Sequence, residues 1–583
     1  MKTISNKYFY ITLLSIIFIF YFLCLTPYVQ GGDTAELVLA AKNLFVAHPP
    51  GYPLFIWLNF IWNKIFFIST DYFRASFLNI IFSLSTIIFL TKEHYQSRTK
   101  LIWLIAVYFF TIPIFEATIL PDVFALHAFF IGWIFYSFRN YYSNNLEKLT
   151  YIGFPFFLGF TNHLTMILFS PLFITAFIKL YRDTYYRLRF IVRSIVAFIL
   201  SLGIYLSIFF FNTKSYYSWG NIETLMDLIK HILRFDYGTF NFAPQASSSN
   251  IFSTYQFFIT ENYFTLLFLL IPIFLSIKTK EALKKYFPVL ASSLLTVLFL
   301  ATANFNLDSF GAEIILRFHT LPILALVFSL SILFEFQSNF SLNKLQNFIL
   351  YIVVIFLFLR INPYLKMRND SLMENYYKNV LATAIKSQSK IILTDNDSEY
   401  FGIRYFQKQN RFDDVAVISP PLFFHSWYLD KIKRANDYFQ LPTAQKIVTT
   451  KNLDLEKDLI LPNLSSTNIY VLKDFNNIDA YNITFHKLGR VISSKEKSSG
   501  QVIDLQYPFI GIQLAAPNNL FSKNYFLDNY AYYYINQAKS YYQVNDFRKA
   551  LYYLKSALMV APNNLKIKEN ICSIKKDEPV CRN

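Results

Sequence analysis

Long apolar runs recur along the first 361 residues, and short polar stretches separate them. The first run, Tyr8 to Leu25, carries no charge, and its length suffices to cross a hydrocarbon core of roughly 30 Å. After Arg360, polar and apolar positions mix as they do in water-soluble proteins. The pattern predicts an α-helical polytopic membrane domain, residues 1–361, followed by a soluble portion. We expect about eleven spans, near residues 8–25, 73–90, 101–115, 122–138, 150–160, 164–179, 194–212, 256–276, 287–301, 317–335 and 346–361.

The charges give these spans a direction. Lys2 and Lys7 precede the first span, and later cations gather in alternate loops such as 92–100 and 182–193, whereas acids gather in the opposite loops. Since cytoplasmic loops are rich in Lys and Arg, the N-terminus is expected in the cytoplasm. An odd number of spans then sends the C-terminal region to the other side. The formal charge of +17 is therefore a topology signal, with membrane lipid and not nucleic acid as the natural partner.

Keeping this alternation requires two structural choices. The segment from Tyr52 to Ile68 must lie along the membrane as an interfacial helix, because a crossing there would place the next basic loop outside. The segment from Tyr151 to Leu180 must be a hairpin that turns near Thr161–His163. The first span is alternatively a cleaved signal peptide, but the absence of a small-residue cleavage pattern before Gly31 favours an anchor.

The soluble portion begins with a helix–strand–helix–strand pattern over residues 372–387, 390–394, 398–409 and 414–418. A βαβ-like order of this kind predicts an α/β domain, assigned to residues 362–525. The carboxylate-rich turn Asp395–Asp397 between the first strand and the next helix either binds a ligand or a cation, or simply caps the helix.

Residues 526–583 are predicted to contain a TPR-like helix pair. The positions that fit a single tetratricopeptide repeat are Tyr534, Ala538, Tyr541, Ala550, Leu554, Ala557 and Pro562. A single repeat cannot bury both of its faces, so it is expected to cap the preceding domain, with a peptide-binding groove as the alternative. Cys572 and Cys581 are able to pair in an oxidising compartment.

The candidate chemistry lies just outside the first span. Asp33 and Glu36 stand three residues apart at the start of a predicted helix, where the helix dipole favours ionised carboxylates. Asp33 is either a general base that deprotonates a hydroxyl or only the cap of that helix. His48, which precedes two prolines and Tyr52, is expected to bind phosphate, orient Asp33, or satisfy a backbone carbonyl.

Polar residues at the outer ends of other spans extend this site. Boundary ionisable groups are functional candidates by default, and the candidates here are Glu116, Asp122, His163, Trp219 and Arg317. Arg317 is the best cation for an anionic head group, since a guanidinium holds two phosphate oxygens at once; its alternative role is an interfacial anchor. His127 lies within a span and is as easily a packing residue. No nucleotide-binding glycine loop and no zinc-like spacing occurs, so neither a metal nor a soluble nucleotide donor is expected.

These motifs carry a family resemblance. The segments 32–36 and 47–54, followed by 121–127, 162–165, 219–221 and 317–318, resemble a family of polytopic membrane proteins long described only as a domain of unknown function. Its eukaryotic relative is the endoplasmic-reticulum O-mannosyltransferase that acts on plexin-type immunoglobulin-like domains. The soluble segments 393–397 and 413–415 resemble its bacterial members.

That family is similar to the GT-C glycosyltransferases, which use polyprenyl-phosphate sugars. The resemblance implies Asp33 as catalytic base, Glu36 as a second catalytic carboxylate, and His48 beside them. It also implies interfacial helices in the first outer loop. One departure is Asp122–Phe124, where relatives often carry Glu-Val-Tyr; the shorter acid and the lost hydroxyl weaken any role assigned there.

The resulting hypothesis is a membrane glycosyltransferase. It moves mannose or another hexose from a polyprenyl-phosphate donor to a hydroxyl of a protein or glycan on the extracytoplasmic face, with no cofactor. The substrate-binding residues are His48, Tyr52, Asp122, His163, Trp219 and Arg317. The alternative is a non-catalytic assembly or export factor whose TPR-bearing outer domain binds a client; a transporter is disfavoured because the ionisable groups gather at the membrane edge. A bacterial inner membrane facing the periplasm is favoured over the endoplasmic reticulum.

Overall fold

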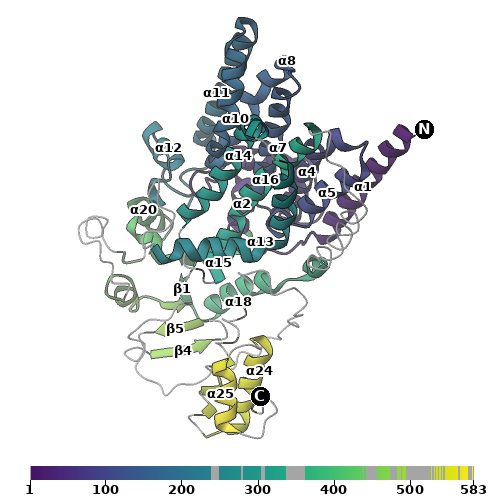
Figure 1. Cartoon of the computed structure of the whole chain (residues 1–583). Coiled ribbons are helices and arrows are strands. Elements are labelled where there is room, and N and C mark those ends of the chain that lie inside the picture. Colours follow the sequence, from purple (N-terminus) through teal and green to yellow (C-terminus); the bar gives the residue numbers. More distant parts are fainter. Residues whose placement is uncertain are drawn as a thin grey trace.

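The computed structural model describes residues 2–237, 248–276, 280–303, 309–336, 362–394, 396–436, 439–441, 456–472, 482–486 and 489–493, with parts of 527–581. Helices occupy one end of the molecule, and the strands with the C-terminal helices occupy the other (Figure 1). The principal helices before residue 337 are α1 (Lys2–Cys24), α2 (Thr34–Asn43), α3 (Pro53–Ile65), α4 (Asp71–Thr91), α5 (Arg98–Phe109), α6 (Ile112–Ile119), α7 (Phe124–Phe138), α8 (Leu146–Leu149), α9 (Gly153–Phe160), α10 (Ser170–Tyr181), α11 (Thr184–Leu206), α12 (Leu225–Ile232), α13 (Ser248–Ser276), α14 (Lys280–Phe299), α15 (Ser309–Phe318) and α16 (Thr320–Phe336).

Six of the described helices are long and apolar enough to cross a membrane. A seventh span results if α5 and α6, which meet at an angle of 70°, form one broken crossing. The chain is therefore a multi-pass membrane protein by length and composition. This count is lower than the eleven expected from the sequence: two predicted spans correspond to short helices, α7 with 15 residues and α9 with 8, and the span predicted at 256–276 lies in α13, which is not among the six. The predicted span 346–361 lies outside the described residues.

Two local predictions concern the course of the chain between spans. The segment after the proline pair forms α3, whose 13 residues extend only about 20 Å at 1.5 Å per residue, too short to cross the membrane. The segment 151–180 is interrupted at Thr161–His163, between α9 and the 3₁₀-helix Leu164–Phe169 that leads into α10. The short α3 and the interruption at Thr161–His163 agree with these two predictions, whereas two membrane spans within 151–180 stay a prediction.

Beyond residue 361 the structure contains a five-stranded sheet with the order β2-β1-β3-β5-β4. The strands are β1 (Ser389–Leu393), β2 (Ala416–Ile418), β3 (Asn468–Val471), β4 (Asn482–His486) and β5 (Gly489–Ser493). Strand β1 pairs in parallel with β2 and β3, and β5 pairs antiparallel with β3 and β4. Helices α18 (Leu372–Lys386), α19 (Asp397–Asn410) and α20 (Ser426–Ala435) accompany it. The first four elements agree with the predicted order, and parts of the remaining assignment to 525, such as 494–525, lie outside the described residues.

This sheet region is joined to the membrane domain through buried polar contacts. The ammonium group of Lys431 donates hydrogen bonds to the carbonyls of Thr213, Ser215 and Ser218 at 2.7–3.0 Å. The hydroxyl of Tyr216 donates to the carbonyl of Val417 on β2 and accepts from its backbone N–H. The loop after α11 is thereby fixed against the edge of the sheet.

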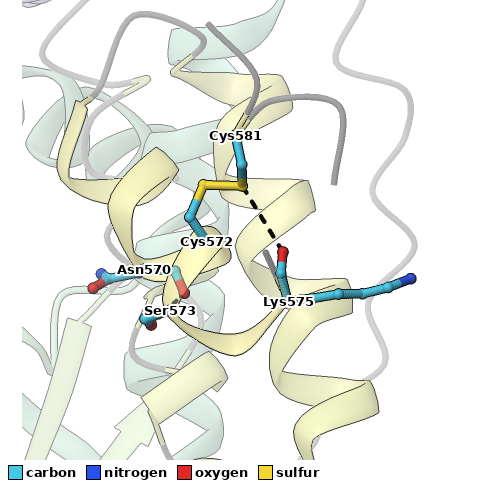
Figure 2. The surroundings of a disulfide bond; sticks show 5 residues. All are labelled: Asn570, Cys572, Ser573, Lys575 and Cys581. Carbon is cyan, nitrogen blue, oxygen red and sulfur yellow. Dashed lines mark hydrogen bonds between the residues drawn. A yellow bond between two sulfur atoms is a disulfide. The ribbon is translucent and has the colours of Figure 1, made fainter. Parts of the chain in front are cut away.

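The C-terminal helices α24 (Phe547–Val560) and α25 (Leu565–Ile574) lie beyond the sheet. Ala550, Leu554 and Ala557 are buried, and the ring of Tyr541 stacks on Tyr553. Pro562 and most of the region before α24 lie outside the described residues, so the TPR assignment stays a prediction. Cys572 and Cys581 form a disulfide, with the sulfur of Cys581 lying 3.8 Å from the carbonyl oxygen of Lys575 (Figure 2).

Candidate functional site

The site begins at the turn that leads into α2. Gly32 has φ +68°, and a Cβ there would lie 3.0 Å from Oε1 of Glu313, so both its backbone and its surroundings require glycine. Asp33 occupies the N-cap position of α2, yet its side chain makes no cap hydrogen bond. The carboxylate is thus not a helix cap, and its geometry directs it elsewhere.

Asp33 is paired with Arg317 at the end of α15. A guanidinium nitrogen of Arg317 donates to Oδ2 of Asp33 at 2.7 Å, and the same nitrogen lies 3.5 Å from Oδ2 of Asp122. Burial raises the pKa of Asp33, but the charges of Arg317 and His48 lower it by more, so the pKa falls below its ordinary value. Three predicted site residues from distant segments therefore meet at one point.

His48 lies next to Glu36, which precedes it by 12 residues in the sequence. Its backbone N–H donates to Oε1 of Glu36 at 2.8 Å, and its ring Nδ1 lies 2.5 Å from Oε2. On the other side of the ring, Nε2 lies 3.0 Å from the hydroxyl of Tyr52 and 4.0 Å from Oδ2 of Asp33. Burial lowers the pKa of His48, but Glu36 and Asp33 raise it by more, so the net shift is upward.

His163 lies beside Tyr52, with the two rings stacked at 6.1 Å. Its Nδ1 accepts from the backbone N–H of Thr165 at 3.2 Å, and the Thr165 hydroxyl lies 3.0 Å from Nε2 of His127. Burial and the neighbouring His127 lower the pKa of His163 well below its ordinary value. Its surroundings therefore favour the neutral form of His163, whereas those of His48 shift the pKa upward. The buried His127 is linked to His163 through Thr165.

Trp219 approaches His48 from the loop after α11, with ring centroids 6.2 Å apart. Its indole N–H donates to Oδ2 of Asp236 at 2.8 Å, and Oδ1 of Asp236 lies 3.5 Å from Nδ1 of His425. Trp427 of α20 lies 5.5 Å from Trp219. Aromatic residues from the membrane domain and the sheet region meet here.

A small cavity of about 30 Å³ opens beside Arg317, with space for roughly two water molecules. Its lining includes the turn at Gly31 and Gly32 and the acids Glu116, Asp122 and Glu313. Oε1 of Glu116 accepts a hydrogen bond from Tyr364 at 2.5 Å. Glu116 therefore belongs to the wall of this cavity.

Sequence reasoning missed the contribution of α19. The hydroxyl of Ser398 accepts the backbone N–H of Gly32 at 2.7 Å, and Phe401 stacks on His48 at 6.2 Å. Asp397, at the start of α19, has its pKa raised to about 6 by burial and by Asp33. The acidic turn at 395–397 was the available signal, although its cap is Asn396, which accepts from the backbone N–H of Glu399. Asp395 lies outside the described residues.

The eight predicted site residues thus form one continuous set of contacts. It offers carboxylates, an imidazole that accepts or donates a proton, and a guanidinium suited to an anion. Among the residues described, no group of three or more His, Cys, Asp or Glu side chains is arranged to hold a metal ion.

The fold and this set of contacts define a class: a multi-pass membrane protein with a charged site where its helices meet a sheet region. Residues 33–185 match the model of the protein O-mannosyl-transferase TMEM260 N-terminal domain family. This match confirms the resemblance to an O-mannosyltransferase-related family over the segment that carries Asp33, Glu36, His48, Tyr52, Asp122 and His163.

Two relatives extend the comparison. The chain is 30% identical over 240 residues to "Protein O-mannosyl-transferase tmem260" of Dictyostelium discoideum, and 28% identical over 232 residues to "Protein O-mannosyl-transferase TMEM260" of Mus musculus. The alignments cover 36% and 38% of this chain and 29% and 33% of the relatives. The chain thus matches only about a third of the length of either relative.

Proposed function

We propose that the protein is a membrane glycosyltransferase of the GT-C type that transfers mannose or another hexose from a polyprenyl phosphate to a hydroxyl of a protein or glycan acceptor. The observation that carries this proposal is the Asp33–Arg317 pair, which puts a carboxylate base and a phosphate-binding cation 2.7 Å apart beside apolar helices. The names of the two relatives, both O-mannosyl-transferases, support the same reaction class.

In this mechanism the donor phosphate binds Arg317, because a guanidinium forms two parallel hydrogen bonds to phosphate oxygens. Binding of the phosphate draws the guanidinium away from Asp33 and frees that carboxylate. Asp33 then deprotonates the acceptor hydroxyl as it attacks the sugar carbon. The electron pair of the broken bond leaves with the phosphate, whose developing charge Arg317 stabilises. Attack opposite the leaving group inverts the sugar carbon.

The remaining site residues surround this reaction. Asp122 also faces Arg317, at 3.5 Å, and helps to orient the guanidinium. Tyr52, His163 and Trp219 form the wall next to His48 and would contact the sugar or the acceptor. No cofactor is required beyond the lipid-linked donor.

The orientation proposed for the membrane places the N-terminus in the cytoplasm and the site and sheet region outside. The Cys572–Cys581 disulfide supports this side, because disulfides persist mainly in oxidising compartments. A bacterial inner membrane, with the C-terminal region in the periplasm, remains the favoured setting.

The test is transfer of radiolabelled hexose from polyprenyl-phosphate mannose or polyprenyl-phosphate glucose by the purified protein in proteoliposomes, with serine/threonine peptides and methyl hexosides as acceptors. Asp33→Asn is expected to lower the transfer rate by about 10³-fold. Asp71→Asn is the matched control, since Asp71 is also paired with cations, Lys42 and Arg74, but away from the site. A folded, membrane-inserted Asp33→Asn protein with full activity would refute the proposal.

A further inference from the structure

The contacts of His48 assign it a part in the chemistry. We propose that the proton removed from the acceptor hydroxyl ends on Nε2 of His48, with Glu36 fixing the ring so that Nε2 is the accepting atom. This inference rests on the proposed transferase function and deepens it, since it gives a proton-relay role to a residue so far treated only as a neighbour of the base.

Glu36 determines the orientation and the tautomer of the ring. Its two oxygens receive the backbone N–H and the ring Nδ1 of the same residue, His48, at 2.8 Å and 2.5 Å. A carboxylate only accepts hydrogen bonds, so Nδ1 must carry a proton, and Nε2 of the neutral ring is left with its lone pair. The ring is buried, with 8% of the residue exposed, which restricts it to this orientation.

The accepting atom faces the place where the acceptor must bind. Nε2 of His48 lies 4.0 Å from Oδ2 of Asp33. A hydroxyl oxygen about 2.8 Å from each atom fits between them, and it donates its single proton to Oδ2 of Asp33 with Nε2 beside it. In the free protein Nε2 lies 3.0 Å from the hydroxyl of Tyr52, and this hydroxyl must turn away before Nε2 accepts the proton from Asp33.

The charges favour His48 over Asp33 as the final holder of the proton. In the free protein Oδ2 of Asp33 accepts from Arg317, and the charges of Arg317 and His48 hold the pKa of Asp33 below its ordinary value. Burial disfavours the protonated form of His48, but the charges of Glu36 and Asp33 outweigh burial and raise its pKa.

Charged and titratable groups on the surrounding elements also affect the protonation of His48. Arg234, after α12, opposes protonation of His48, and a charged His48 in turn lowers the pKa values of His231 and His163. Asp397 of α19 favours the charged ring. The pH dependence of the relay therefore reports the sum of these groups and not Glu36 alone.

The step balances as follows. The acceptor O–H bond breaks, and its oxygen forms the new bond to the sugar carbon while the bond from that carbon to the phosphate oxygen breaks. The phosphate leaves with the electron pair. The proton passes through Asp33 to Nε2 of His48, so Asp33 returns to its ionised state and the imidazolium is balanced by Glu36. Departure of the lipid phosphate then lets Arg317 pair with Asp33 again.

Glu36→Gln is the sharpest test, because glutamine keeps the shape of glutamate but not its charge. The new amide donates to Nδ1, which forces the ring proton onto Nε2 and leaves no accepting atom. We expect kcat for hexose transfer from polyprenyl-phosphate mannose to fall about 10² to 10⁴-fold, with the KM for that donor changed less than threefold. Glu36→Asp, which keeps the charge, should recover part of the loss.

The pH profile separates this role from a structural one. The native rate should fall at acid pH as His48 becomes protonated, with a midpoint above the ordinary histidine value of about 6.5. In Glu36→Gln the midpoint should move to lower pH. Glu374→Gln is the matched control: Glu374 also accepts a backbone N–H, from Val29 at 2.9 Å, and its replacement should leave kcat and the profile unchanged.

The outcomes are distinguishable. If His48→Gln and Glu36→Gln both keep the native kcat and the native acid midpoint while Asp33→Asn is inactive, the relay is wrong and the proposed function stands. If Asp33→Asn retains full transfer, the proposed function itself fails. A Glu36→Gln protein that changes only the donor KM would assign Glu36 to donor binding and overturn the relay.

Discussion

Asp33 and Arg317 are separated by 284 residues of sequence, yet a guanidinium nitrogen of Arg317 donates to the carboxylate of Asp33 at 2.7 Å. The pair joins the first outer loop to the end of α15. In the free protein the carboxylate and the guanidinium neutralise each other, which explains why both groups are tolerated in a largely buried position. A bound anion would compete with Asp33 for the guanidinium.

The first prediction concerns that competition. Arg317→Met removes the phosphate-binding group, so we expect the KM for polyprenyl-phosphate mannose to rise more than about tenfold and kcat to fall about 10² to 10³-fold. Arg317→Lys keeps the charge but not the bidentate geometry and should lie between Met and the native residue. Initial-rate kinetics in proteoliposomes measure both constants; equal donor KM values in all three proteins would contradict phosphate binding by Arg317.

The second prediction tests the contact between α19 and the first outer loop. Ser398→Ala removes the acceptor of the buried Gly32 N–H, and an unsatisfied buried donor costs about 1 to 3 kcal/mol. Thermal unfolding in detergent should show the lower stability, together with reduced transfer. Ser426→Ala, at an exposed position on α20, is the control and should change neither.

The third prediction concerns a side chain added at Gly32, in the turn that leads into α2. Gly32→Ala adds a Cβ that lies 3.0 Å from Oε1 of Glu313 at a backbone φ of +68°, a conformation that costs about 1 kcal/mol for a residue with a Cβ. Displacement of the Glu313 and Arg317 side chains should lower transfer at least about tenfold. Native kinetics in this variant would show that the turn tolerates a side chain and that Arg317 does not depend on it.

The fourth prediction is a dependence of stability on pH. Burial and Asp33 raise the pKa of Asp397 to about 6, above its value of about 3.9 in an unfolded chain. The folded state therefore binds more protons than the unfolded state between about pH 4 and 6, and stability falls as the pH rises through that window. Ionised Asp397 should cost roughly 1 to 3 kcal/mol at pH 7.

Asp397→Asn should consequently raise the unfolding midpoint at pH 7 and have little effect at pH 4. Thermal unfolding of the detergent-solubilised protein at the two pH values measures the difference. Asp414→Asn provides the comparison, since the Asp414 side chain is 66% exposed. An equal rise in the unfolding midpoint of Asp397→Asn at both pH values would show that the stabilisation is unrelated to the ionisation of Asp397.

The fifth prediction concerns the side of the membrane. With the C-terminal region outside, a membrane-impermeant maleimide added to intact cells should label Cys572 and Cys581 only after treatment with a reductant. Cys24, buried in α1, should stay unlabelled throughout. Labelling that requires lysis of the cells would place the C-terminal region in the cytoplasm.

Local sequence patterns correctly predicted several helix ends and the order of neighbouring helices and strands. The interruption at Thr161–His163, the short helix after the proline pair and the order of α18, β1, α19 and β2 all agree with the sequence interpretation. The span count did not, because the apolar runs predicted at 122–138 and 150–160 form helices of only 15 and 8 residues, α7 and α9.

Long-range contacts of the site were less predictable. Asp33 and Glu36 stood out because they follow a span, and Arg317 because it lies at a membrane boundary. The acidic turn at 395–397 suggested a ligand near the start of α19, but it did not indicate that α19 packs against Gly32 and His48. Similarly, the sequence left open whether Asp33 caps α2 or is a reactive carboxylate. Its contact with Arg317, far along the chain, was needed to decide.

The Tyr216 hydroxyl, which bonds to both the N–H and the carbonyl of Val417, has a consequence for work with fragments of this protein. A strand edge with free backbone groups is a template for aggregation, and β2 is an edge strand whose cover comes from the loop after α11. A recombinant piece that starts near residue 362 would lack that cover. Such a piece should self-associate through β2 unless the loop is supplied, so soluble expression calls for a fusion that includes residues 212–219.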